Sequence, residues 1–354
     1  MTFLWEYLRS SSLPIVIYGM GDGADKLFLR CEQFGVPVAD IFASDEYVRG
    51  HVFRGYRVLK YSEVCEKYDH FIILLAFAAF EDGLISKITE YAHKHELYAP
   101  DLPLFGGEIL TPDWVHDHAD DIRLSYSVLA DDQSKKVFET VLRYKLSGDV
   151  LDLRSCESPR NEIFESIFHF DTNESFLDLG AYNGDTALEF ASQVNNQYKQ
   201  IIAVEPDKKN YDKLLRTVSD LHNVRCINAG IWDSSGLLSF SGGGGRASCI
   251  APDMVIDSDT SKKYHIPVDT IDNIVGDADI TYIKMDVEGA EHEALDGGKN
   301  TLRRCHPKLA ISAYHRTHDF LELILKIHEI DPSYKIYLRH HPYIPAWETN
   351  IYAV

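Results

Sequence analysis

The sequence lacks paired cysteines. Its six cysteines are scattered over 354 residues without any Cys-x-x-Cys pair, so their pattern predicts neither a zinc site nor a disulfide framework. This use of cysteine is typical of proteins in a reducing compartment, and we expect a cytoplasmic location.

Long hydrophobic runs and a leader-like N-terminus are missing as well. The longest apolar run, residues 71–80, is far shorter than the roughly 20 residues that span a bilayer. The opening segment MTFLWEYLRSSS has no basic stretch followed by an apolar one, which a signal peptide needs. We therefore expect no membrane partner and interpret residues 71–80 as a buried strand.

Basic residues are too few for a nucleic-acid partner. The chain has 35 Lys and Arg against 55 Asp and Glu, which gives a formal net charge of -20. Such a surface repels phosphate backbones, so we expect no nucleic acid among the partners. The length and the 45% hydrophobic content together predict a globular protein of two domains.

The order of apolar segments divides the chain into three parts. Residues 1–112 begin with a strand at 15–18, a glycine turn, a helix and a strand at 36–42, which predicts a small Rossmann-like α/β domain. Residues 113–172 show helical stretches without strand alternation and are interpreted as a helical connector. The only low-complexity tract, 242–245, is interpreted as a flexible loop.

Strands and helices alternate in the third part, residues 173–354, which predicts a parallel sheet. The expected strands are 176–179, 201–204, 224–228, 280–285 and 309–314, and the expected helices are 186–194, 211–221, one from about 290, and 320–330. Tyr211, Leu214, Leu215, Val218 and Leu221 form the apolar stripe of the second helix. The strands 334–338 and 350–354 have no room for a helix between them, so we expect a doubly wound sheet with an antiparallel last strand.

Glycines and acids follow the strand 176–179. The stretch reads Asp178, Leu179, Gly180, Ala181, Tyr182, Asn183, Gly184, Asp185. The glycines leave room for a ligand near the backbone, whereas the two acids repel the diphosphate that a dinucleotide site binds at a helix N-terminus. The turn therefore favours a cationic ligand without phosphate, whose amino-acid end Asp178 helps to hold. The alternative is an ordinary turn between a strand and a helix.

An acid also stands at the end of the next expected strand. Glu205, followed by Pro206 and Asp207, is placed to accept hydrogen bonds from both hydroxyls of a ribose. The same acid would serve NAD, so by itself it indicates only an adenosine-like ligand. Ile231 and Trp232 follow the third strand, where they form an apolar wall for an adenine ring, although Trp232 fits the core equally well.

The densest group of charges follows the strand 280–285. The sequence Lys284-Met-Asp286-Val-Glu288-Gly-Ala-Glu291 brings carboxylates to the edge of the sheet where ligands bind. The alternative is that these acids cap the next helix. Clustered carboxylates suit Mg²⁺, but nothing in the spacing fixes a coordination geometry, so we predict no metal.

Together these stretches resemble a known family. Residues 178–185, Val204-Glu205-Pro206, Ile271-Asp272 and residues 283–291 look like the FkbM family of methyltransferases, and the resemblance covers roughly residues 160–354. It implies a class I methyltransferase fold with S-adenosylmethionine as the cofactor and a hydroxyl of a sugar, glycan or natural product as the methyl acceptor. It also implies that Asp178, Gly180, Glu205 and Asp286 line the cofactor and acceptor site.

Methyl transfer to a hydroxyl needs aligned reactants and a base, because an alcohol is a weak nucleophile. A positioned base contributes about a hundredfold to ten-thousandfold. Asp286, Glu288 and His315, which follows the strand 309–314, are the candidate catalytic residues, and Asp286 or His315 is the favoured base. His315 is one of 16 histidines, most of which have no catalytic duty.

The N-terminal part offers a second reading. Gly19, Gly21 and Gly23 form only part of a dinucleotide fingerprint, because the third glycine follows the second too closely. With Asp45 as a ribose acceptor, this turn would make the chain an NAD-dependent oxidoreductase, but we expect a recognition or oligomerisation module instead. A further alternative is a non-catalytic binding protein with a methyltransferase fold. The oligomeric state stays open, a homo-oligomer included.

Overall fold

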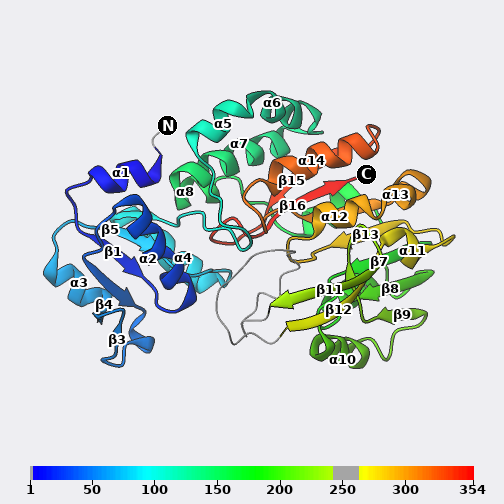
Figure 1. Ribbon diagram of the computed structural model, residues 1–354, viewed down its shortest axis with the longest axis horizontal. Coiled ribbons are helices and arrows are strands. Elements are labelled where there is room, and N and C mark those ends of the chain that lie inside the picture. The colour runs from blue at the N-terminus through cyan, green and yellow to red at the C-terminus, as the bar shows by residue number, and fades with distance from the viewer. Residues whose placement is uncertain (1–2, 242–262) are drawn as a thin grey trace.

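Two sheets lie side by side along the long axis of the molecule, with helices packed around both (Figure 1). The computed structural model describes residues 3–241 and 263–354, so the expected loop 242–245 lies outside the described residues. The architecture is α/β, as the sequence predicts, with a Rossmann-like sheet in each half. No helix in the described ranges is long and apolar enough to cross a membrane.

The N-terminal sheet has the strand order β3-β4-β2-β1-β5-β6. Its strands are β1 (Ile15–Tyr18), β2 (Asp40–Ala43), β3 (Val52–Phe53), β4 (Tyr56–Lys60), β5 (Ile72–Leu75) and β6 (Glu96–Tyr98). Its helices are α1 (Leu4–Ser10), α2 (Asp22–Phe34), α3 (Tyr61–Lys67) and α4 (Asp82–Lys94), with a short 3-10 helix η1 (Asp45–Tyr47). All pairs are parallel except the hairpin β3–β4.

Two expected strands of this sheet are shorter than predicted. The strand expected at 36–42 begins only at Asp40, since Pro37 has no N–H to give to a ladder. The apolar run 71–80 forms a strand only at Ile72–Leu75. The hairpin β3–β4 was not predicted, because its residues are mostly exposed or half-buried and so lack a clear apolar alternation.

Helices link the two sheets. They are α5 (Pro112–Asp117), α6 (Ala119–Val128), α7 (Asp132–Ser147) and α8 (Val150–Arg154), followed by the π-helix η2 (Ile163–Phe168). The Phe138 ring of α7 lies 5.3 Å from the Phe320 ring of the C-terminal half, and the Ala130 N–H donates to the Ile336 carbonyl. One hydrophobic core therefore runs from the N-terminal sheet through α7 to the last strands of the chain.

The C-terminal sheet has the order β15-β16-β14-β13-β7-β8-β9. Its strands are β7 (Ser175–Leu179), β8 (Gln200–Val204), β9 (Val224–Ile227), β13 (Tyr282–Met285), β14 (Lys308–Ser312), β15 (Ile336–His340) and β16 (Thr349–Ala353). β16 is antiparallel to both of its neighbours and every other pair is parallel, which confirms the expected doubly wound sheet with an antiparallel last strand. This is the class I methyltransferase arrangement.

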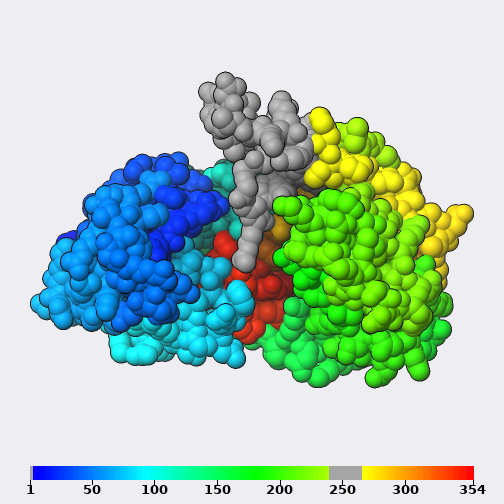
Figure 2. Space-filling view, turned by 90° about the horizontal axis from the view of Figure 1, so that it is seen from below, coloured from blue at the N-terminus to red at the C-terminus, as the bar shows by residue number. Residues whose placement is uncertain are grey.

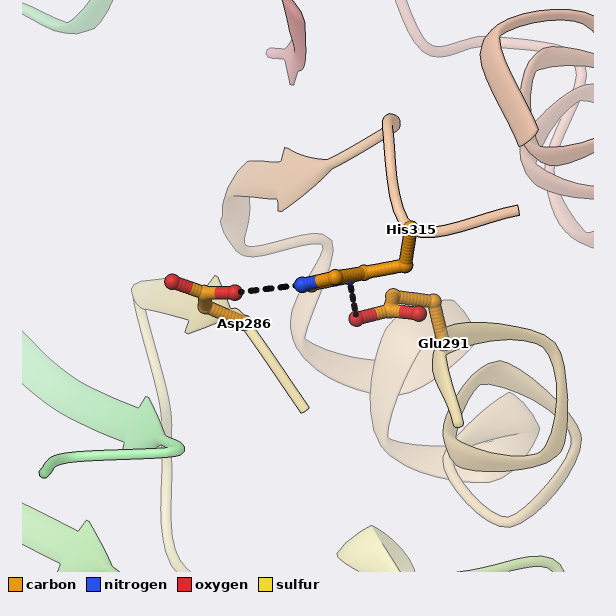
Figure 3. A group of neighbouring side chains, drawn as sticks. All are labelled: Asp286, Glu291 and His315. Carbon is orange, nitrogen blue, oxygen red and sulfur yellow. Dashed lines mark hydrogen bonds and ion pairs between the residues drawn. The ribbon is translucent and has the colours of Figure 1, made fainter. Parts of the chain in front are cut away.

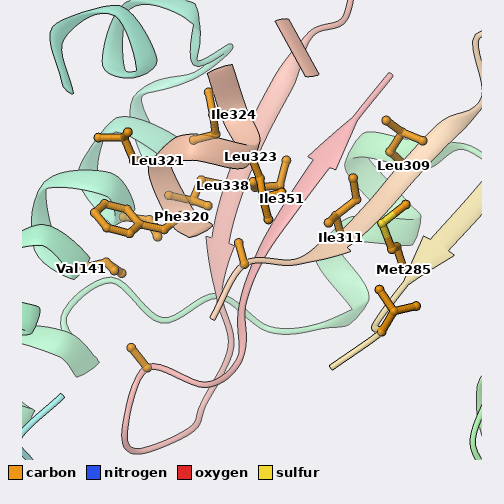
Figure 4. Packing of buried hydrophobic residues seen from close by; sticks show 14 of the residues in the cluster. Val141, Met285, Leu309, Ile311, Phe320, Leu321, Leu323, Ile324, Leu338 and Ile351 are labelled. Atoms are coloured by element: carbon orange, nitrogen blue, oxygen red, sulfur yellow. The ribbon is translucent and has the colours of Figure 1, made fainter. Parts of the chain in front are cut away.

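Helices cover both faces of this sheet because its side chains alternate between them. The helices are α9 (Asp185–Gln193), α10 (Lys208–Thr217), α11 (Ile271–Val275), α12 (Glu291–Asp296), α13 (Lys299–Cys305) and α14 (Asp319–Ile330). Met285, Leu309 and Ile311 point to the face where Phe320 and Ile324 of α14 pack (Figure 4). Alternation sends Tyr282 and Lys284 to the opposite face, toward the site described below.

Two further corrections concern the C-terminal half. α10 starts at Lys208 because the Asp207 side chain caps it, and it ends at Thr217 rather than at 221; Leu215 of the expected stripe is 43% exposed. The strands β10 (Gly230–Ile231), β11 (Gly236–Ser241) and β12 (Lys263–Asp269) form a small third sheet that the sequence did not predict. In the view of Figure 2 the C-terminal residues, in red, lie between the two halves of the molecule.

Candidate active site

A cavity of about 1510 Å³ opens at the carboxyl edge of β7, β8 and β13. Of the residues expected at a site, the ones that line it are Gly180, Tyr182, Asp185, Glu205, Pro206, Asp207, Ile231, Asp286 and Glu288. The expected residues outside the lining are Asp178, Asn183, Gly184, Trp232 and His315. The fold thus gathers at one place most of the residues that the sequence singled out from four separate segments.

The turn after β7 brings two strand ends into contact. Gly180 has a φ of 78°, and a Cβ there would lie 1.9 Å from the carbonyl oxygen of Asp286. Glycine is therefore required so that the turn can touch the end of β13, in addition to any approach of a ligand. Tyr182 adopts a left-handed backbone (φ 45°) and is 51% exposed at the cavity. Strained residues of this kind gather at functional sites.

Asp178 does not reach the cavity itself. Its carboxylate is fully buried and faces the Lys284 ammonium at 3.6 Å, while that ammonium donates to the Gly180 carbonyl at 3.0 Å. Burial raises the pKa of Asp178 to about 6, although Lys284 opposes the shift. Asp178 thus contacts Lys284, which lines the cavity, and its expected role in holding the amino-acid end of a ligand stays a prediction.

Glu205 lies at the cavity in a prepared position. Its carboxylate accepts the backbone N–H groups of Tyr182 and Asp207, both at 2.9 Å, and the residue is only 6% exposed. Burial raises the pKa of Glu205 to about 7, against the lowering effect of the two N–H donors. Asn228 fixes the same loop by donating to the Glu205 and Pro206 carbonyls. The sequence analysis did not assign this role to Asn228.

The two residues expected beside an adenine ring are separated by the fold. Ile231 of β10 lines the cavity together with Ala229 and Gly230. Trp232 is instead buried in the core, and its backbone N–H donates to the Asp269 carbonyl at 3.0 Å. Of the two residues, only Ile231 lines the cavity, and its contact with an adenine ring stays a prediction.

The acids after β13 meet His315, as Figure 3 shows for three of the side chains. His315 Nε2 lies 3.3 Å from Asp286 Oδ1 and 3.6 Å from Glu288 Oε2, and Nδ1 lies 2.9 Å from Glu291 Oε1. Lys284 lies 3.9 Å from Asp286 on the other side. The catalytic candidates thus form one charged network, with Asp286 and Glu288 at the cavity and His315 behind them.

The network fixes the charge of its members. Burial disfavours a charged His315, but Glu291, Asp286 and Glu288 outweigh burial and raise the pKa of His315 to about 10. Burial likewise disfavours a charged Asp286, but Lys284 and His315 hold the pKa of Asp286 below its usual value. A protonated His315 has no free lone pair on its ring, so this shift favours Asp286 of the two candidate bases, and the choice between them stays a prediction.

Glu288 and Glu291 have different environments. Glu291 is buried in the first turn of α12, and its Oε1 accepts both the Val287 N–H and the His315 contact. The carboxylate lies in the first turn of the helix, where negative charge is favourable, but α12 has no side-chain cap hydrogen bond. Glu288 has a left-handed backbone (φ 55°) and a half-exposed side chain, and burial raises its pKa.

Asp286, Glu291 and His315 are the group of described side chains whose ligand atoms are close enough to hold a metal, all within 4.8 Å of one another. Both ring nitrogens of His315 already face carboxylates. This geometry suits an ion-pair network, and the absence of a metal stays a prediction.

The chain packs closely against two of the three glycines of the N-terminal turn, whereas a Cβ at Gly21 would meet nothing within 4 Å. A Cβ at Gly19 would lie 2.6 Å from the Phe77 ring, and one at Gly23 would lie 2.1 Å from the Ala76 carbonyl oxygen. These glycines therefore let the turn pack on the end of β5, while Asp45 is exposed in η1. Nothing in this packing favours a nucleotide.

Several lining residues gave no signal in the sequence. Glu189 lies on α9, Ser312 on β14 and Asn350 on β16. Arg160 and Glu348 precede η2 and β16. Tyr314, whose hydroxyl donates to Asp286 at 3.5 Å, was also missed. Because β16 returns beside β14, only the topology brings residues 348–350 to this edge.

Comparisons with known proteins concern the family and the fold of the chain. Residues 178–335 match the family model described as the methyltransferase FkbM domain. The fold is similar to the crystal structure of methyltransferase FkbM from Methylobacillus flagellatus KT, with a TM-score of 0.74 and 24% identity over 99% of this chain and 92% of that chain. A precorrin-6y C5,15-methyltransferase from Geobacter metallireducens GS-15 matches with a TM-score of 0.34 and 14% identity, over 55% of this chain and 85% of that chain.

A search of curated proteins finds no match. The family model and the first structural likeness bear out the resemblance read from the sequence, including S-adenosylmethionine as the cofactor. Residues 178–335 of the chain therefore form a region that matches the FkbM methyltransferase family model.

Proposed function

We propose that the chain transfers a methyl group from S-adenosylmethionine to a hydroxyl oxygen of a sugar, glycan or natural-product acceptor. One observation carries this proposal: Tyr182 and Glu205 share a single cavity with Asp286. The cavity volume of about 1510 Å³ exceeds the roughly 300–1,000 Å³ of a pocket for one small ligand. It therefore has room for a cofactor and an acceptor together.

The charges around the cavity support a cationic nucleoside. Seven carboxylate residues line it against five Lys and Arg residues, so its surroundings are negative overall. Such a balance favours an ammonium and a sulfonium and disfavours a diphosphate. In this proposal Glu205 accepts the ribose hydroxyls, Ile231 contacts the adenine ring, and the turn at Gly180 and Tyr182 holds the amino-acid end.

A bound cofactor would supply an electrophilic methyl carbon for the acceptor oxygen, and the chain's own residues would align the two and take up the hydroxyl proton. Asp286 is the residue that we propose as the acceptor of the hydroxyl proton, since it lines the cavity and is ionised at neutral pH. His315 and Lys284 hold its carboxylate in place from two sides. Glu288 is the second carboxylate within reach of the same space.

The remaining lining supports an acceptor with several hydroxyl groups. Arg160, Glu189, Glu348 and Asn350 offer donors and acceptors beyond Asp286. Tyr352 adds an aromatic side chain, which suits the apolar face of a sugar ring. We therefore propose a sugar as the methyl acceptor, which methyl transfer to a panel of glycans tests.

Calorimetry with S-adenosylmethionine and the full chain tests the cofactor part. We expect saturable binding that Glu205→Ala abolishes. Asp220→Ala, which removes an exposed carboxylate that follows α10 and lies outside the cavity lining, is the matched control and should bind like the unaltered chain. No binding by the unaltered chain would refute the proposal. Transfer of labelled methyl to a panel of glycans then tests the acceptor class.

Two alternatives can be distinguished from this proposal, one by NADH binding and one by methyl transfer. An oxidoreductase using Gly19 to Gly23 would bind NADH, and we expect no change of NADH fluorescence because the chain packs against Gly19 and Gly23 of that turn. A non-catalytic binding protein would bind S-adenosylmethionine without transferring the methyl group to any acceptor. We also keep the cytoplasm as the proposed location, since the described cysteines, Cys31, Cys65, Cys156, Cys226 and Cys305, are free.

A further inference from the structure

The segment that leaves the N-terminal sheet touches the back of the active site. Phe105, between β6 and α5, donates its backbone N–H to the His315 carbonyl at 3.1 Å. Its ring centre lies 5.6 Å from that of His315. The same ring covers Gly289, where a Cβ would lie 3.0 Å from Phe105 Cδ2. One side chain from the first half thus contacts both segments that carry the charged network.

Gly289 explains why this contact is specific. Its φ of 89° belongs to the left-handed region, which suits glycine, and the Phe105 ring occupies the space that any larger side chain would need. Its carbonyl also accepts the Arg316 Nε–H at 2.9 Å. Because Glu288 directly precedes Gly289, the Phe105 ring packs against the loop that carries Asp286 and Glu288.

The segment around Phe105 is fixed at both ends. Asp101 forms a buried ion pair with Lys145 of α7 at 3.0 Å. On the other side the Thr317 hydroxyl donates to the Glu108 carbonyl at 2.7 Å, and Leu110 is fully buried. Arg30 of α2 donates to the Gly107 carbonyl. The N-terminal half therefore holds Phe105 against the site by several independent contacts.

We propose that Phe105 is a positioning residue of the methyltransferase site, which the N-terminal half supplies to hold His315 and the Glu288–Gly289 turn and to keep water from the imidazole. It touches neither the cavity nor the reacting atoms. This inference rests on the proposed function, because the network it holds is the proposed proton acceptor. Misplacing such a network by about 1 Å costs about a hundredfold in rate.

Exchange of the His315 ring protons with water tests the inference without knowledge of the acceptor. The chain is labelled with ¹⁵N-histidine, and the His315 signals are identified by their loss in His315→Gln. We expect Phe105→Ala to speed the exchange of these protons at least tenfold, and Phe105→Leu to speed it less. The matched control is Phe80→Ala, which removes a 59% exposed ring stacked on Tyr343 at another contact between the halves; we expect no change there.

Binding of S-adenosylmethionine separates the two proposals. We expect Phe105→Ala to bind it within twofold of the unaltered chain, because Phe105 lies outside the cavity. Unchanged exchange of the His315 protons in a folded Phe105→Ala or Phe105→Leu chain would overturn the role of Phe105 and leave the proposed function standing. Failure of the unaltered chain to bind S-adenosylmethionine would overturn the proposed function instead.

Discussion

Glu205 makes the affinity for S-adenosylmethionine depend on pH. Burial holds its pKa at about 7, whereas the ordinary value is 4.5. Only the ionised carboxylate accepts hydrogen bonds from both ribose hydroxyls, so ligand binding must release a proton wherever the free protein carries one. With a pKa of about 7, the apparent affinity should rise about eightfold from pH 6 to pH 7.5 and then level off.

The same pKa shift also sets how the stability of the ligand-free protein depends on pH. The pKa of Glu205 is raised above its unfolded value, so its contribution to stability is full below pH 4.5 and is lost as the pH rises through about 7. The shift corresponds to about 3 kcal/mol of the free energy of unfolding. Binding of the cofactor and folding of the free protein therefore respond to pH in opposite directions at this one residue.

Isothermal titration calorimetry measures both the affinity and the proton count. Titrations at several pH values from 6 to 7.5, each in two buffers of different ionisation enthalpy, give the number of protons released. The window stops there because an α-amino group such as that of a chain N-terminus titrates at about 7.7–8.0 and would add protons of its own. Glu205→Gln should bind weakly and without this slope. A slope that persists in Glu205→Gln, or an affinity in the unaltered chain that falls from pH 6 to 7.5, would refute the reasoning.

Three other outcomes follow from the structure. Asp286→Asn should lower methyl transfer about a hundredfold to ten-thousandfold while the calorimetric affinity for S-adenosylmethionine changes little, because it removes the proposed proton acceptor and keeps the shape; full activity in this variant would exclude that role. Asp101→Ala should cost about 3–5 kcal/mol in urea unfolding, since it leaves Lys145 buried without its partner, and a loss under 1 kcal/mol would contradict this. Dialysis against a chelator should leave methyl transfer unchanged, because His315 already faces carboxylates at both nitrogens; restoration of a lost activity by Mn²⁺ would show that a metal is required.

Much of the fold could be predicted because periodicity acts locally. The strands of the C-terminal sheet agree with the expected ones to within a few residues, and the antiparallel end follows from the short connection before β16. The hairpin β3–β4 and the sheet of β10, β11 and β12 were missed. Their side chains are largely exposed or half-buried in the described ranges, so tertiary contacts rather than an apolar pattern define them.

The site residues were predictable where a carboxylate directly follows a strand. Glu205 and Asp286 follow β8 and β13 directly, and parallel strands bring such positions to one edge. The charge of His315 was not predictable, because it depends on three carboxylates that surround the ring only in the folded chain. The contact between Asp178 and Lys284 was not predictable for a similar reason, because only the pairing of β7 with β13 places these two residues opposite each other.

The shared core has a consequence for shortened forms of the chain. Val16 of β1 and Ile336 of β15 belong to one hydrophobic cluster, and Ala79 beside the N-terminal sheet pairs with Ile344 near the C-terminus. The last two strands and the segment between them therefore cover apolar surface of the first half, and a shortened chain that stops before β15 would leave that surface exposed to water.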